Sequence, residues 1–171
     1  MTIAELLLQD FDAEIAGARK TLERIPEAEA ASGWKPHEKS MPMGRLAMHV
    51  ANLPKFATYI MTTPSMDMAS STLPKPDFTF KDRATLLKAL DDSAAEARKH
   101  LAAASDADLA QKWKFSFGDR VILDEPRSKT YRLMFFNHLI HHRAQLGYDL
   151  RALNLKVPGM YGPTADEPVG G

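Results

Sequence analysis

Apolar residues recur at helical spacing in four long stretches of the chain, and charged residues fill the positions between them. In the first stretch, for example, Leu7, Phe11, Ile15 and Leu22 fall near one face. The stretches cover about residues 3–24, 42–60, 82–104 and 128–153. Pro26 follows the first stretch and Pro42 opens the second, as expected for a residue that ends helices or occupies their first turn. The pattern therefore predicts four long helices.

The second stretch carries a histidine within its apolar stripe. His49 lies between Leu46 and Leu53, at a position where an apolar side chain is expected. Pro54 follows closely and cannot donate a hydrogen bond to the carbonyl of Val50, so we expect a kink just past His49. The stripe predicts that the imidazole of His49 faces the interior.

The segments between the helices have different patterns. Polar and apolar residues alternate over residues 112–117, Gly118-Asp119 follows, and residues 120–123 are again mostly apolar, which predicts a short β-hairpin. Residues 62–76 and 157–163 are rich in helix breakers and predict loops. The predicted fold is all-α, a four-helix bundle with a short β-hairpin before the last helix, formed as one domain over residues 1–171.

Charge and composition exclude several classes of function and of site. Lys plus Arg and Asp plus Glu both number 22, and this balance argues against a nucleic-acid partner. There is no cysteine, which excludes disulfides, thiolate catalysis and zinc-finger sites. The first residues include Glu5 and no basic segment, so we expect no signal peptide. No apolar run approaches the roughly 20 residues of a membrane span, and we predict a cytoplasmic protein.

Two of the six histidines, His138 and His142, stand four residues apart in the fourth predicted helix. Residues at this spacing lie on one face with Cβ atoms roughly 5–6 Å apart, so both rings can reach one metal ion. His49 qualifies as a third ligand from another helix. The alternative is that these are ordinary core histidines hydrogen-bonded to neighbours. Burying three imidazoles without partners is unfavourable, however, and this favours metal coordination.

Several segments resemble one known family. They are Asn137-His138-Leu139-Ile140-His141-His142-Arg143-Ala144-Gln145-Leu146, Val157-Pro158-Gly159-Met160-Tyr161-Gly162-Pro163, Trp34-Lys35-Pro36 and Gly44-Arg45-Leu46-Ala47-Met48-His49-Val50. Together they resemble the DinB-like (damage-inducible) family across essentially the whole chain, and the most specific part is the His-x3-His-Arg-x-Gln motif.

The resemblance implies a four-helix bundle of up-down-down-up crossover topology, with His49, His138 and His142 at the positions of the family's metal ligands. It also implies a homodimer and a divalent ion such as nickel, zinc, manganese or iron. Related members act as thiol-dependent transferases or isomerases, and others are described as metal-dependent hydrolases.

Three protein ligands are typical of catalytic metal sites, because they leave a coordination position open. The expected partners are a small-molecule substrate or a small thiol cosubstrate, since the chain has no thiol of its own. The alternative is a non-catalytic stress-response or binding protein with a structural or sensory metal. It is favoured by the lack of any Asp or Glu on the predicted ligand face near His138.

The neighbours of the motif allow further expectations. Gln145 either orients a histidine or ligand, or merely closes the end of the bundle. His141 points away from His138, and Arg143 is expected to face solvent. Residues 34–40 and 157–163 are candidate walls of a pocket. Apolar residues on more than one side of the first and last helices predict a homodimer interface at Leu6, Leu8, Leu133 and Phe136.

Overall fold

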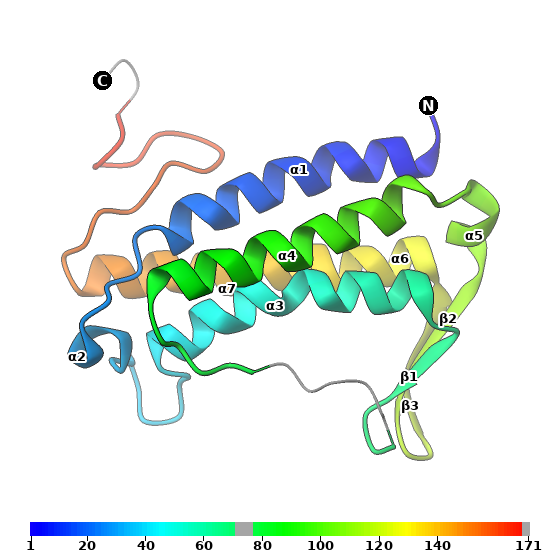
Figure 1. Cartoon of the computed structure of the whole chain (residues 1–171), viewed down its shortest axis with the longest axis horizontal. Coiled ribbons are helices and arrows are strands. Elements are labelled where there is room, and N and C mark those ends of the chain that lie inside the picture. The colour runs from blue at the N-terminus through cyan, green and yellow to red at the C-terminus, as the bar shows by residue number, and fades with distance from the viewer. Residues whose placement is uncertain (71–76, 169–171) are drawn as a thin grey trace.

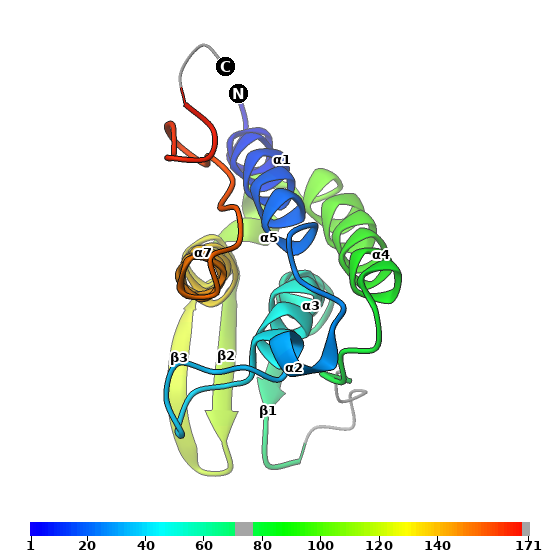
Figure 2. The same ribbon diagram turned by 90° about the vertical axis from the view of Figure 1, so that its left-hand side faces the viewer.

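The computed structural model describes residues 1–70 and 77–168, which are mostly helical with one small sheet (Figure 1). The longest helices are α1 (Ile3–Leu22), α3 (Met43–Thr62), α4 (Arg83–Ala102) and α7 (Asn137–Ala152). Helix α3 packs against α4 and α7, and α1 packs against the same two helices, as seen nearly end-on in Figure 2. Four long helices are confirmed: the ends of α1, α3 and α4 differ by at most two residues from the prediction, whereas α7 begins nine residues later than the predicted start of the fourth helix.

Local signals explain where these helices begin. Thr2 caps α1 through a capping box, in which its hydroxyl accepts from the Glu5 backbone and the Glu5 carboxylate accepts from the Thr2 backbone. Asp82 accepts from the backbone N–H of Thr85 at the start of α4. Helix α3 runs unbroken past Pro54.

The last predicted helix is interrupted. It consists of α6 (Arg127–Tyr131), a π-helical turn η1 (Arg132–Phe136) and α7. A π-helical turn holds more residues than an α-helical turn, and it therefore changes which residues face the core beyond it. Phe135 and Phe136 are both buried here, with ring centroids 5.0 Å apart. Periodicity alone did not predict this turn, which lies directly before His138.

The sheet has the order β1-β2-β3 and lies beyond the C-terminal end of α3 (Figure 1). Strands β2 (Lys112–Phe117) and β3 (Arg120–Pro126) form the predicted antiparallel hairpin, which turns at Gly118 with a φ of 56°. Strand β1 (Ser65–Asp67) pairs in parallel with β2, so the loop prediction for residues 62–76 is wrong at β1. Three residues are too few to show alternation. Residues 71–76 lie outside the described part of the chain.

Two short helices were also not predicted, α2 (Glu29–Ser32) and α5 (Asp106–Ala110). Neither is long enough to show a helical period, although Ser105 and Asp108 form a capping box at α5. No helix in residues 1–70 and 77–168 is long and apolar enough to cross a membrane.

The segment after α7 has neither helix nor strand from Leu153 to Pro168, as predicted for residues 157–163. It returns along α1 and is held there by two polar contacts (Figure 1). Glu167 accepts from the Arg24 guanidinium at 2.6 Å, and the Tyr161 hydroxyl donates to the Glu14 carboxylate at 2.7 Å. The tail therefore packs on the α1 side of the molecule.

Candidate metal centre

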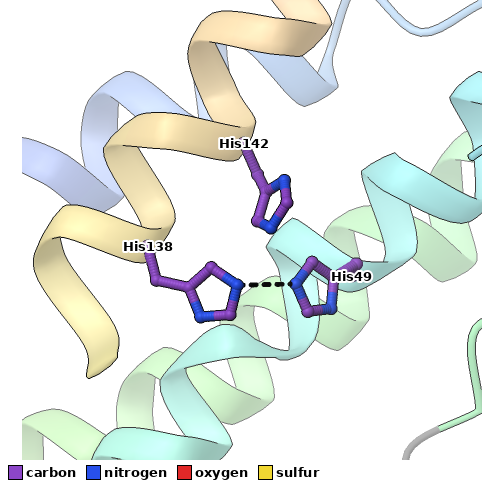
Figure 3. A group of neighbouring side chains, drawn as sticks. All are labelled: His49, His138 and His142. Atoms are coloured by element: carbon purple, nitrogen blue, oxygen red, sulfur yellow. Dashed lines mark hydrogen bonds between the residues drawn. The ribbon is translucent and has the colours of Figure 1, made fainter. Parts of the chain in front are cut away.

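Three imidazoles from two helices meet between α3 and α7 (Figure 3). Helix α3 supplies His49, and α7 supplies His138 and His142. One ligand atom of each ring lies within 4.8 Å of those of the other two. All three predicted residues are thus brought together, and no other His, Asp or Glu of the described residues joins this group.

The spacing of the rings suits a single ion. The Nε2 atoms of His49 and His138 are 3.2 Å apart. Two nitrogens bound at 2.0–2.1 Å to one tetrahedral ion are separated by about 3.3–3.4 Å. The separation of these two nitrogens therefore suits one divalent transition metal, and His142 offers a third nitrogen within 4.8 Å of both.

Hydrogen bonds orient the two rings of α7. The Nδ1 of His142 lies 2.7 Å from the Oε1 of Gln145, so that Nδ1–H donates to the amide oxygen. The ring of His138 hydrogen-bonds to the backbone of Met134, one turn earlier. When Nδ1 carries the proton, Nε2 keeps its lone pair for coordination. Of the two interpretations of Gln145, orientation of a histidine is the one that its geometry favours.

The histidines are held in their neutral form. Burial, together with the neighbouring rings of His142 and His138, lowers the pKa of His49 to about 4. Burial also lowers the pKa values of His138 and His142. A neutral imidazole is the form that binds metal, so the site needs no proton loss at neutral pH.

His141 lies outside the group, as expected. Its side chain is exposed, and its ring centroid is 4.9 Å from that of His142. It offers a matched control for any variant of the adjacent ligand position.

A cavity of about 450 Å³ reaches the centre at His142. Its walls come from the loop before α3, including Lys39 and Ser40, from the start of α3 at Leu46, and from α7 at Gln145. The loop was predicted as a wall, and Pro36, Lys39 and Ser40 of it line the cavity. The tail was predicted as a second wall, and this was wrong for this cavity because the tail packs on the α1 side.

One carboxylate beside the centre, that of Asp149, was not predicted from the sequence. It lies seven residues after His142, lines the same cavity and is only 3% exposed. Burial raises the pKa of its carboxyl to about 6. We had expected no Asp or Glu near the ligand face. The seven-residue spacing from His142 is the signal that could have identified it, because it returns to nearly the same face after two turns.

Arg143 corrects a second expectation, that it faces solvent. Its side chain is 5% exposed, and its Nη1 lies 2.6 Å from the Oε2 of Glu14 on α1. A second N–H donates to the Tyr161 hydroxyl in the tail. A Cβ at Gly17 would lie 2.6 Å from the Nη1 of Arg143, so the glycine makes room for the guanidinium. Arg143 joins α7 to α1 and the tail and does not line the cavity.

Comparison with known proteins agrees with the fold. The family model of the DinB superfamily matches residues 10–146. The crystal structure of a DinB-like protein from Bacillus cereus superposes with a TM-score of 0.66 at 20% sequence identity, covering 90% of this chain and 95% of that one. At this identity the likeness concerns the fold alone. No curated protein matches the chain.

Proposed function

This chain belongs to the DinB superfamily, and from that premise we propose that it binds one divalent transition-metal ion through His49, His138 and His142. We propose further that the centre is catalytic, in a hydrolase or a thiol-dependent transferase acting on a small molecule. Nickel, zinc, manganese and iron all accept imidazole nitrogen as a ligand, and the donor set does not select among them.

The observation that carries this proposal is the convergence of three imidazoles, two of them oriented by hydrogen bonds, beside a cavity that His142 lines. Structural zinc sites are closed by four protein ligands, whereas catalytic sites have three and keep a position for water or substrate. No fourth ligand stands near the group among residues 1–70 and 77–168. This favours catalysis over a purely structural ion.

A divalent ion in this position would supply a Lewis acid that lowers the pKa of a water molecule or thiol bound to it. The chain's own residues do the rest. Gln145 lines the cavity and holds the ring of His142 through its amide oxygen, which leaves its amide N–H groups unused by this hydrogen bond. The chain has no cysteine, so a sulfur nucleophile would arrive with the substrate or cosubstrate.

The alternative proposal is a non-catalytic stress-response or binding protein with a sensory metal. A sensor can have the same three ligands and an open position. Its main support was the expected lack of a carboxylate near the site, and the position of Asp149 in the cavity weakens that support. Turnover tests on esters and on small thiols with electrophilic cosubstrates separate the two proposals.

Metal analysis of variants tests the site directly. Purified protein should hold about one divalent ion per chain. His142→Ala should lower the occupancy severalfold, because it removes one of the three proposed ligands and leaves only two. His141→Ala is the matched control and should keep full occupancy. Elemental analysis by mass spectrometry measures both, and full occupancy in His142→Ala would show that the ligand assignment is wrong.

Three further expectations from the sequence belong to the same proposal: the up-down-down-up bundle topology, a homodimer and a cytoplasmic location. The packing of α1, α3, α4 and α7 is compatible with the first. The exposed apolar side chains of Leu6 and Leu133 support the second.

A further inference from the structure

Asp149 is a buried acidic residue in the wall of the cavity beside the metal centre. A buried carboxylate is normally paired or hydrogen-bonded, because moving its charge out of water is unfavourable. Asp149 is only 3% exposed, yet its carboxylate accepts no hydrogen bond and forms no ion pair with any residue that the structure describes. Its carboxylate therefore lacks a partner within this part of the chain.

The position of Asp149 relative to the metal centre is fixed by one helix. His138, His142, Gln145 and Asp149 fall within a narrow arc of α7, because their spacings of four, three and four residues return to the same face. The seven residues from His142 to Asp149 span about 10 Å along the axis. His142 and Asp149 both line the same cavity, with Gln145 between them. The cavity wall thus carries the imidazole of His142 and, two turns further along α7, the carboxylate of Asp149.

We propose that Asp149 is the second anchoring point of the ligand site, and that this site takes a small primary amine whose other end carries a carboxylate or thiol. The proposal rests on the metal-binding function proposed above, because the carboxylate or thiol end would reach the ion. The ammonium end would donate to Asp149 and satisfy the carboxylate that the fold leaves unpaired. In this arrangement Asp149 selects and positions the ligand.

The ammonium group of Lys39, which also lines this cavity, could pair with Asp149 in place of a ligand amine, so the test must separate the two. Lys39 lies on the loop before α3 and its side chain is exposed. No described residue forms an ion pair with its ammonium group. If Lys39 neutralised Asp149 in solution, the wild-type site would show no preference for amines.

The test compares two ligands that differ only in the amine. Isothermal titration calorimetry of the zinc-loaded protein should give about tenfold tighter binding of 6-aminohexanoate than of hexanoate, since one charge-assisted hydrogen bond is added. The shorter pair, β-alanine and propionate, should show no such preference because β-alanine cannot span from the ion to Asp149. Equal binding of the two long ligands by the wild-type protein would overturn the proposal.

Variants assign the preference to Asp149. Asp149→Asn keeps the shape of the side chain and should remove the preference while hexanoate still binds. Lys39→Met is the matched control and should retain the preference. A preference that survives Asp149→Asn would also overturn the proposal.

The zinc content of each sample is measured in parallel. Loss of the one-ion stoichiometry in the wild-type protein counts against the proposed function, whereas intact stoichiometry without a preference for the amine counts against this inference alone.

Discussion

Two side chains beside the metal centre, Asp149 and Gln145, determine how the site behaves at the scale of single residues. Both lie on the face of α7 that carries the histidines, and both line the cavity. One is a buried carboxylate without a described partner, and the other is hydrogen-bonded to a ligand candidate. Each leads to a prediction, one about stability and one about metal affinity, that can be tested without knowing the substrate.

Asp149 should make stability depend on pH. Burial raises its pKa from the usual 3.8 to about 6, so the folded protein holds this proton more tightly than the unfolded chain. Below about pH 4 the carboxyl is protonated in both the folded and the unfolded state and does not affect the free energy of unfolding. Its unfavourable effect on folding grows as the pH rises from about 4 through 6. Asp149→Asn should raise the free energy of unfolding by about 1–2 kcal/mol at pH 8 and leave it unchanged near pH 4.

Urea denaturation of the metal-free protein at the two pH values measures this difference. Lys39 and His142 also line the cavity, together with Tyr148, and all three are identical in the two proteins compared. An equal gain in stability at both pH values would mean that the ionisation of Asp149 is not the cause.

Gln145 should affect metal affinity without being a ligand. Residues that hydrogen-bond to a coordinating histidine typically alter affinity by about 10–100-fold when they are removed. Gln145→Leu should therefore weaken metal binding by at least about tenfold, as measured by competition with a chromogenic chelator. Gln9→Leu, on an exposed position of α1, is the control and should bind as the wild type does. Unchanged affinity in Gln145→Leu would show that the hydrogen bond to His142 is dispensable.

At the scale of elements, the long helices and the clustering of the three histidines could be predicted from the sequence, and the irregular elements could not. Helical periodicity over some twenty residues is a strong signal, and the i,i+4 spacing of His138 and His142 makes their shared face certain once the helix is known. The π-helical turn of η1 and the strand β1 are set by tertiary packing and pairing instead. Their sequences are too short to carry a period of their own.

The same distinction explains the two errors at the site. The burial of Arg143 depends on Glu14 and Gly17 of α1, and these residues lie more than 120 positions earlier. Asp149 lines a cavity whose opposite residues come from the loop before α3, more than 100 positions earlier. Local patterns hold no information about which charged residue another element will cover, so Arg143 was expected to face solvent and Asp149 was not identified.

The contacts of Arg143 with Glu14 on α1 and Tyr161 in the tail should stabilise the packing of α7 against these segments. Arg143→Met leaves the carboxylate of Glu14, 12% exposed, without its cation, and should lower the free energy of unfolding by about 3 kcal/mol. Arg98→Met breaks the exposed ion pair with Asp12 and is the matched control, with little expected change. Thermal unfolding followed by circular dichroism compares the two. Similar small shifts in both variants would contradict a structural role for the buried pair.

At the scale of the whole molecule, exposed apolar side chains indicate where a second copy would bind. Leu6 on α1 and Leu133 on η1 are 49% and 42% exposed, and the ion pair of Arg132 with Asp10 joins the two segments. Phe136 was expected at the same interface, but it is only 2% exposed and belongs to the core. The predicted surface for self-association is therefore smaller than the sequence suggested.

Light scattering coupled to size exclusion tests the homodimer. The wild-type protein should run as a dimer at micromolar concentration, and the double variant Leu6→Glu, Leu133→Glu should run as a monomer because the new charges would be buried without partners. Ile122→Glu, at an equally exposed apolar position of β3, is the control and should remain dimeric. A dimer that persists in the double variant would place the interface elsewhere.

The division of the three histidines between two helices has a consequence for folding. His138 and His142 come together as soon as α7 forms, whereas His49 is 89 positions away from His138 and joins them only when α3 has docked. An ion held by all three rings would act as a cross-link that closes this long loop, and an unfolded chain could offer it only part of the ligand set. By mass action, free metal at a hundred times its dissociation constant would stabilise the native state by about 2.7 kcal/mol. The melting temperature would then report metal loading, and a starved cell would hold a less stable protein.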